Sequence, residues 1–284
     1  MSQKKQWLNN LPGIVERLSA QWNLHNLTPL PQGWAGNMVY AAEQKLPRGL
    51  LREVALKVGY DHQAIKQEAY ALRFFSEGSC VVLLDNNEEC AALLLERIAP
   101  GTRLLSCFPH DEKQAIHITV QIMQNLHSAT GDYSSFPTIQ QWLTGLEKNW
   151  PYLQNHLPKA RALASYLVKT QQEPVLLHGD LHHENILQDH AGTWLAIDPK
   201  GVIGEPAYEV GSFVRNSIPD LLKQPNILGI ISYRLDLFAE LLKIDRQRIK
   251  EWCYVQEVLA DCWSLKDGAD PENMFDLARI IADA

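Results

Sequence analysis

The pattern of apolar residues changes at Pro100, and this change constrains the fold more than any other feature of the sequence. Before it, short apolar runs such as residues 54–58 and 91–95 have the length and composition of strands. After it, apolar residues recur every three or four positions, which is the period of helices. We therefore predict an α+β fold with two lobes, a small β-rich lobe over residues 1–97 and a larger, mostly helical lobe over residues 98–284.

The same periods predict the positions of the individual elements. In the first lobe we expect a helix over residues 14–22, followed by elements in the order β-β-α-β-β at 39–42, 54–58, 63–75, 81–84 and 91–95. In the second lobe we expect helices over residues 115–127, 138–148, 158–170, 228–243, 245–266 and 271–283. A small β region made of residues 175–177, 186–187 and 194–197 interrupts these helices.

Charge and composition limit the partners of the chain. The formal net charge is −7, which argues against nucleic acid because such binding needs clustered lysine and arginine. The same charge suits a cationic small molecule. The five cysteines lack paired spacing, which indicates reduced thiols. The chain shows neither an apolar leader nor a run of about 20 apolar residues, so we expect a cytoplasmic protein that does not bind a membrane.

The segment of residues 178–185 (HGDLHHEN), which we name the HGD loop, carries the candidate chemistry. Asp180 and Asn185 lie in a loop between two short strands. Asp180 can accept the proton of an attacking hydroxyl, and the amide oxygen of Asn185 is a suitable Mg²⁺ ligand. Asp198 ends the next apolar strand, and a turn at residues 189–192 predicts a hairpin that brings it near Asn185.

A charged residue also interrupts an apolar strand of the first lobe. Lys57 lies within residues 54–58, where an ammonium group needs a partner. The phosphates of a nucleotide and the carboxylate of Glu68 on the next helix are both available. Together, Lys57, Glu68, Asp180, Asn185 and Asp198 supply what phosphoryl transfer requires, namely a base, metal ligands and a cation for the triphosphate.

Each of these residues also has a plainer interpretation. The histidines of the HGD loop and Glu184 can be zinc ligands, although Gly179 argues against a helix there. Lys57 can be an edge-strand residue whose ammonium reaches solvent, and Asp198 can cap a turn. The loop of residues 32–40 can cover phosphates through its backbone N–H groups or be a simple turn.

Several sequence segments together resemble the aminoglycoside phosphotransferase group of the protein-kinase-like fold. More narrowly, the chain resembles the aminoglycoside/hydroxyurea resistance kinase family, which includes streptomycin 6-kinases. The segments that carry the resemblance are residues 67–72, 93–102, 178–187, 195–201 and 204–209. The strings HGDLHHEN and IDPKG are the most specific of them.

The resemblance implies a role for each matching residue. Asp180 is expected to be the catalytic base, with Mg²⁺ bound by Asn185 and Asp198. Lys57 is expected to hold the α and β phosphates of ATP and Glu68 to hold Lys57. In the hinge after the last strand of the first lobe, backbone groups from Glu96 to Ile98 are expected to bind adenine. His178 is expected to support the loop without a chemical role.

Two departures from the wider kinase pattern bear on the substrate. Asp198 is followed by Pro199 and Lys200, and because proline fixes φ, a mobile Asp-Phe-Gly switch is not expected. Lys200 adds a cation that can help to neutralise the transferring phosphate. Only a short segment separates Asp198 from Glu205, which leaves no room for an activation loop, so we expect no protein substrate.

The acceptor is expected to be a cationic polyol, which carboxylates and an aromatic wall would bind. The candidates are Glu205, Asp261, Trp263 and Asp267; the alternative for such residues is a solvated acidic helix face. The leading hypothesis is therefore an ATP-dependent kinase of a streptomycin-type aminoglycoside. The rivals are a metabolic kinase of an amino alcohol or sugar, and a silent nucleotide-binding regulatory protein, because function depends on the pocket and not on the fold.

Overall fold

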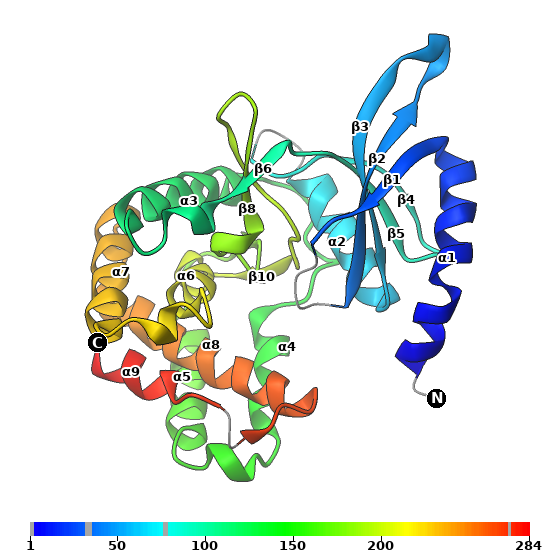
Figure 1. Ribbon diagram of the computed structural model, residues 1–284. Helices are drawn as coiled ribbons and strands as arrows, with labels where there is room; N and C mark the ends of the chain where they lie inside the picture. The colour runs from blue at the N-terminus through cyan, green and yellow to red at the C-terminus, as the bar shows by residue number, and fades with distance from the viewer. Residues whose placement is uncertain (1–2, 32–35, 76–78, 272–273) are drawn as a thin grey trace. The chain divides into compact units, whose positions relative to one another are not determined.

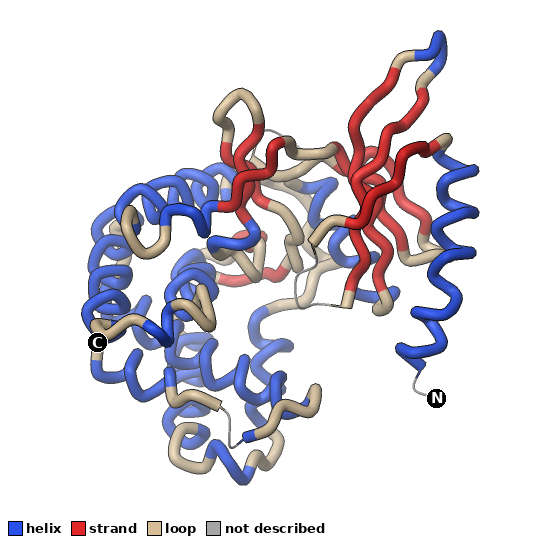
Figure 2. The backbone as a smooth tube through the Cα atoms, viewed as in Figure 1, coloured by secondary structure: helices blue, strands red, loops and turns tan. Residues whose placement is uncertain are grey.

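The computed structural model describes residues 3–31, 36–75, 79–271 and 274–284. The chain divides into two compact units, Met1–Pro100 and Gly101–Ala284, whereas the sequence pattern placed the lobe boundary between residues 97 and 98. The first unit is rich in strands and the second in helices, as Figure 2 shows by colour. This arrangement confirms the predicted α+β class.

The N-terminal unit is built around a five-stranded antiparallel sheet of order β1-β2-β3-β5-β4. Its strands are β1 (Leu24–Pro29), β2 (Asn37–Lys45), β3 (Leu51–Gly59), β4 (Leu83–Asn87) and β5 (Ala92–Glu96). Its helices are α1 (Gln3–Trp22) and α2 (His62–Phe74). The hairpin of β2 and β3 extends beyond the neighbouring strands of this sheet (Figure 1).

The alternation of β3 explains why this sheet carries a helix on each face. Side chains along a strand point alternately to opposite faces, and Val54, Leu56 and Val58 are completely buried in one cluster with Leu18 and other residues of α1. Lys57 therefore points to the opposite face, where α2 packs on β3, β4 and β5. One apolar cluster thus fixes the register that buries the lysine.

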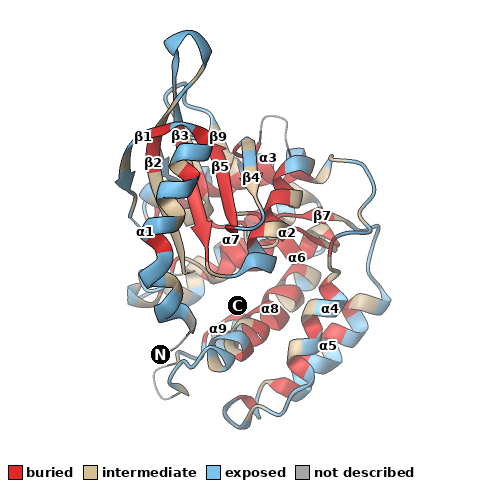
Figure 3. Ribbon diagram, turned by 90° about the vertical axis from the view of Figure 1, so that its right-hand side faces the viewer, coloured by how far each residue is buried: buried red, intermediate tan, exposed pale blue. Residues whose placement is uncertain are grey.

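The C-terminal unit is a helical assembly in which α8 lies at the centre. Its main helices are α3 (Glu112–His127), α4 (Ile139–Leu143), α5 (Leu157–Lys169), α6 (Pro206–Arg215), α7 (Ile227–Leu242), α8 (Arg246–Lys266) and α9 (Leu277–Asp283). Helices α5, α6, α7 and α9 all pack on α8. Its middle, from Trp252 to Leu259, is buried throughout (Figure 3).

Two small sheets frame the HGD loop in this unit. One pairs β7 (Val175–Leu177) with β10 (Val202–Gly204), and the other has the order β6-β8-β9. Its members are β6 (Pro100–Arg103), β8 (Ile186–Asp189) and β9 (Trp194–Ala196). The HGD loop leaves β7 and enters β8, so a strand holds each of its ends.

Several elements differ from those expected. Helix α1 begins eleven residues earlier than the apolar pattern indicated, since Gln3 precedes residue 14, and the final helix begins at Leu277 and not at residue 271. Strand β1 and helix α6 were not expected. Helix α6 begins at Pro206 and contains Gly211, which disguise its helical period, and its core packing overrides these weak local signals. Within the described ranges, no helix is both long and apolar enough to cross a membrane.

Candidate active site

The HGD loop is anchored by a buried glutamate of α6. One carboxylate oxygen of Glu209 accepts a hydrogen bond from the backbone N–H of His178 at 2.6 Å, and the other accepts from the N–H of Gly179 at 2.9 Å. The side chain of Glu209 is only 1% exposed. Charge-assisted hydrogen bonds of this kind are strong, so Glu209 fixes the start of the loop against α6.

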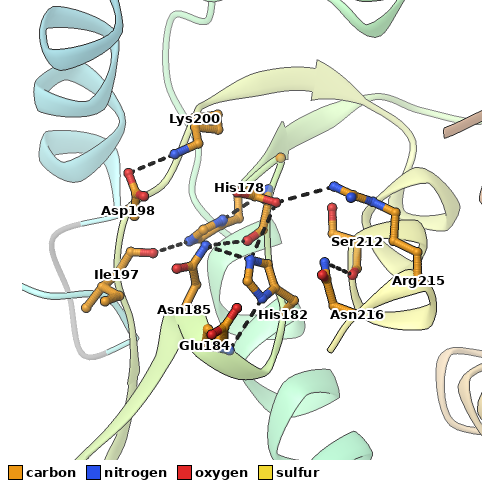
Figure 4. Close-up of polar contacts among 12 residues, drawn as sticks. His178, His182, Glu184, Asn185, Ile197, Asp198, Lys200, Ser212, Arg215 and Asn216 are labelled. Atoms are coloured by element: carbon orange, nitrogen blue, oxygen red, sulfur yellow. Dashed lines mark hydrogen bonds and ion pairs between the residues drawn. The ribbon is translucent and has the colours of Figure 1, made fainter. Parts of the chain in front are cut away.

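His178 has a supporting position, as the resemblance implied. Its Nδ1 accepts from the N–H of Asp180 at 3.2 Å, and its Nε2 lies 2.9 Å from the carbonyl oxygen of Ile197. The proton is therefore on Nε2, which donates to Ile197. Burial lowers the pKa of His178, so the ring is neutral at neutral pH. It joins the HGD loop to the segment that carries Asp198 (Figure 4).

Gly179 is required at its position for two reasons. Its φ is +85°, in the left-handed region that residues other than glycine rarely adopt. A Cβ there would lie 2.9 Å from Trp142 and 3.1 Å from Val202. The tight loop that presents Asp180 thus depends on this glycine.

Replacing Gly179 with alanine is expected to lower the free energy of unfolding by about 1–3 kcal/mol. Chemical denaturation monitored by circular dichroism measures this change. The matched control is Gly192→Ala, because Gly192 also has a φ of +85° but its Cβ would meet only a glutamine side chain at 3.8 Å. The Gly179 variant should lose more stability than the Gly192 variant. Equal losses would show that the contact with Trp142 has no effect.

Asp180 lies beside two groups that bear on its charge. Its Oδ1 is 3.7 Å from Nη2 of Arg215 and 3.7 Å from Nε2 of His182, and its side chain is 25% exposed. Burial raises the pKa of Asp180, but His182, Lys200 and Arg215 outweigh this effect, so the pKa lies below its usual value. Burial lowers the pKa of His182 to about 4. Asp180 is therefore an ionised carboxylate at neutral pH.

The hairpin of β8 and β9 brings Asn185 and Asp198 toward each other. The carbonyl oxygen of Asn185 accepts a hydrogen bond from the N–H of Ile197 at 2.9 Å, directly before Asp198. Asn185 Nδ2 donates to the carbonyl oxygen of Asp180 at 2.9 Å. This contact leaves Asn185 Oδ1 available as a ligand, which fits the oxygen chemistry of Mg²⁺.

Asp198 combines an unusual backbone conformation with a paired carboxylate. Its φ is 61°, in the left-handed region. Residues other than glycine that adopt this conformation cluster at functional sites. Its Oδ1 lies 2.8 Å from the ammonium group of Lys200 (Figure 4). The backbone N–H groups of Lys200 and Gly201 both donate to the carbonyl oxygen of His178. This segment is therefore tied to the start of the HGD loop.

The histidines of the HGD loop do not form a zinc site. His178 binds the backbone through both ring nitrogens, and His183 instead contacts Glu112 at 3.3 Å. Across the ranges that the structure covers, no group of three or more histidine, cysteine or acidic side chains is placed to hold a metal ion. The zinc interpretation is therefore not supported.

In the N-terminal unit, Lys57 and Glu68 form a buried ion pair. The ammonium group of Lys57 lies 2.8 and 2.7 Å from the two carboxylate oxygens of Glu68, with side chains 7% and 5% exposed. The strand and helix thus aim both groups as the sequence predicted.

Glu96 ends β5 and is exposed, and Ile98 follows it as a half-buried residue. Of the loop of residues 32–40, residues 32–35 lie outside the described residues.

The expected acceptor contact of Glu205 is wrong. Glu205 is 2% exposed, and its carboxylate oxygens bind Arg248 at 2.7–3.0 Å and the indole N–H of Trp252. Its Oε2 also accepts from the N–H of Gln172 at 3.3 Å. These internal contacts occupy both oxygens, so Glu205 holds the start of α6 against α8 and does not face an acceptor.

The other acceptor candidates lie along α8 and at its end. Asp261 is half-buried, Trp263 is 37% exposed, and Asp267 is exposed beyond the last turn. The ring of Trp263 meets that of Trp142 edge-on, with centroids 5.8 Å apart. The two indoles form an aromatic wall in the C-terminal unit.

Two charged groups outside the chosen acceptor candidates act on the same carboxylates. Glu257 is buried one turn before Asp261 on the same face of α8. Arg215 ends α6, and its charge influences the pKa values of Asp180, Glu257 and Asp261. Glu257 and Asp261 have no hydrogen-bond or ion-pair partner among the described residues. The four-residue spacing of the two carboxylates was the available signal.

Three features together define the protein-kinase-like class of small-molecule kinases. They are a buried strand lysine paired with a helix glutamate, the HGD loop, and an aspartate that follows a hairpin. Among solved structures, the chain is similar to choline kinase LicA from Streptococcus pneumoniae, with 15% identity and a TM-score of 0.70. The match covers 97% of this chain and all of that one. A thermostable mutant of aminoglycoside phosphotransferase APH(4)-Ia matches with 16% identity and a TM-score of 0.60, covering 89% and 92% of the two chains. These similarities confirm the fold.

The sequence matches the model of the aminoglycoside/hydroxyurea antibiotic resistance kinase family over residues 53–268, and the chain belongs to this family. It is 27% identical to a hydroxyurea phosphotransferase of Kitasatospora aureofaciens, over 98% of this chain and 80% of that protein. It is 26% identical to a streptomycin 6-kinase of Streptomyces griseus, over 92% and 85%. The protein is therefore a phosphotransferase, which confirms the predicted enzyme class.

Proposed function

We propose that this enzyme transfers the γ-phosphoryl group of ATP to a hydroxyl of a small cationic polyol, with an aminoglycoside of the streptomycin type as the first candidate. The observation that carries the proposal is the ionised carboxylate of Asp180, 3.7 Å from Arg215, in the same unit as Glu257 and Asp261, which form no ion pair with any described residue. Streptomycin kinases among the relatives support the same acceptor class.

Asp180 acts as the general base in this proposal. Its carboxylate accepts the proton of the acceptor hydroxyl while the oxygen bonds to the γ-phosphorus and the bond to the β-phosphate oxygen breaks, which releases ADP. The contact between His178 and the N–H of Asp180 positions the loop for this step. Because its pKa lies below the usual aspartate value, Asp180 carries no proton at neutral pH, which a general base requires.

The nucleotide and its metal are assigned to the remaining predicted residues. We assign the α and β phosphates to Lys57, held by Glu68, and adenine to the backbone between Glu96 and Ile98. Mg²⁺, which would neutralise charge on the phosphates, would be held by Asn185 and Asp198. Lys200, at 2.8 Å from Asp198, adds a cation near these ligands.

The acceptor cation is assigned to Glu257 and Asp261. Glu257 is buried and Asp261 is half-buried, and neither has an ion-pair partner among the described residues. Burying carboxylates in this way is costly unless a cation joins them, and a cationic acceptor supplies one. The indole rings of Trp142 and Trp263, which meet edge-on, offer apolar aromatic surface to the same ligand.

A panel of acceptors tests this proposal. Acceptor-dependent ADP release should be measured with streptomycin, other aminoglycosides, amino alcohols, neutral sugars and hydroxyurea. We expect streptomycin-type compounds to give the highest kcat/KM, and Asp261→Asn to raise their KM more than the KM for ATP. Preference for an amino alcohol or a sugar would favour the metabolic kinase. An absence of turnover with all acceptors would favour the regulatory protein.

The proposed cation site also predicts a pH dependence of stability. Burial raises the pKa of Glu257 to about 7, and burial with repulsion from Glu257 raises that of Asp261 to about 8. Carboxyl groups in the unfolded chain have pKa values of about 4. Between about pH 4 and about pH 8 the folded state therefore binds more protons than the unfolded state. The free energy of unfolding contributed by this pair therefore falls as pH rises from about 4 to about 8.

The Asp261→Asn variant lacks one of the two carboxyl groups that titrate. It should be more stable than wild type toward about pH 8. Urea unfolding at several pH values measures the difference, which should grow with pH and nearly vanish at its lower end. Asp267→Asn, an exposed carboxylate beyond the same helix, is the matched control. A difference that does not depend on pH would contradict the assignment.

A further inference from the structure

A second buried charge network lies in the C-terminal unit and has no direct part in the proposed chemistry. The Nε of Arg234 on α7 lies 2.6 Å from one carboxylate oxygen of Glu112 at the start of α3. The other oxygen of Glu112 lies 3.3 Å from Nε2 of His183 in the HGD loop. Arg234 and His183 are completely buried, and Glu112 is 8% exposed. Three separate elements therefore meet at one carboxylate.

The same guanidinium also holds the end of α6. Nη1 of Arg234 donates to the carbonyl oxygens of Phe213 and Val214 at 3.1 and 2.9 Å, and to that of Asn216. Carbonyl groups in the last turn of a helix lack partners within the helix. Arg215 lies among these three residues, so the guanidinium fixes the backbone that carries it.

Aromatic contacts connect the two held segments. The ring of His183 stacks on that of Phe213, with centroids 3.9 Å apart and planes at 29°. The guanidinium of Arg234 lies 5.3 Å from the centre of the Phe213 ring and 5.4 Å from that of Phe108. The stacked rings of His183 and Phe213 therefore join the HGD loop to the end of α6 by direct packing.

Stability alone does not explain this network. Exchanging a buried ion pair for apolar side chains of similar volume is often neutral or stabilising, because both charges lose their hydration. The network contacts two functional segments at once. Asp180 lies three residues before His183, and its partner Arg215 lies between the carbonyl groups that Arg234 holds.

We propose that Glu112 and Arg234 are positioning residues. Glu112 fixes the HGD loop through His183, and Arg234 fixes the end of α6 through its carbonyl groups. Asp180 and Arg215 thereby keep their mutual placement. The effect on turnover rests on the proposed role of Asp180 as base. The coupling between the two segments does not, and it can be measured without an acceptor.

The coupling is tested by amide hydrogen exchange. The double variant Arg234→Met with Glu112→Met removes both charges and leaves neither buried alone, yet exchange should rise in both residues 178–185 and residues 213–217 more than in the rest of the unit. Arg246→Met is the matched control, since Arg246 forms a partly exposed pair with Asp236 and leaves both segments untouched. Unchanged exchange in either segment, or a uniform rise along the chain, would overturn the proposal.

The consequence for turnover is tested with two variants of His183. His183→Gln keeps a donor for Glu112, whereas His183→Phe keeps a ring against Phe213 and removes the donor. The Phe variant should lose about tenfold or more in kcat with little change in KM for ATP, since small misplacements of catalytic groups are costly. The Gln variant should recover most of this loss.

Equal kcat for wild type and both variants, each corrected for the folded fraction, would also overturn the proposal. If wild type shows no acceptor-dependent turnover, the proposed function fails, and the exchange experiment still decides the coupling. The two failures are therefore distinguishable.

Discussion

Replacing Asp180 with asparagine is expected to lower kcat for the acceptor about 10²–10⁴-fold, with KM for ATP nearly unchanged. Asparagine has almost the same shape and keeps the backbone N–H that bonds His178. It cannot take the proton of the hydroxyl, so the loss reports the base and not the fold. Steady-state ADP release at saturating acceptor measures it.

The control for this variant is Asp220→Asn, an exposed aspartate whose pair with Lys223 contributes little. Its kcat should equal that of wild type. A kcat for Asp180→Asn within a few-fold of wild type would remove Asp180 as the base. In that case Arg215 and Asp180 would form only a structural pair.

Replacing Lys57 with methionine is expected to have the largest effect on stability, about 3–5 kcal/mol, as well as loss of activity. The reason is that Glu68 would remain as a buried carboxylate after losing a partner at 2.7 Å. Thermal and urea unfolding measure the stability, and ADP release measures the activity.

The double variant Lys57→Met with Glu68→Leu separates the two consequences. Since neither charge remains buried alone, stability should return toward wild type. Activity should not return, because the proposed phosphate ligand is still absent. Recovery of activity together with stability would contradict the assignment of Lys57 to the nucleotide.

Much of the fold could be predicted because local patterns and tertiary packing agree. The short apolar run of residues 54–58 indicated the strand β3, and the hairpin turn at residues 189–192 indicated β8 and β9. Where packing overrides local preference, prediction failed. Strand β1 includes Asn26 at a positive φ and Pro29, so its sequence resembles a loop, and pairing with β2 stabilises it.

The residues of the HGD loop and of β3 could be placed from sequence because each carries chemistry within a short segment. Partners on distant helices could not. Glu209 lies in the segment 204–209 that carries the resemblance, but no local pattern shows that its carboxylate holds the N–H groups of His178 and Gly179. Arg215 and Arg234 carry no local signal, since their contacts join segments far apart in the chain.

The central claim is that the HGD loop transfers a phosphoryl group to a small cationic alcohol. Its most direct test is to incubate the enzyme with ATP labelled in the γ-phosphate, Mg²⁺ and streptomycin, and to follow the label by mass spectrometry. We predict that wild type transfers the label to a hydroxyl of streptomycin and that Asp180→Asn transfers it far more slowly. Label found only in inorganic phosphate, at a rate that streptomycin does not change, would contradict the account.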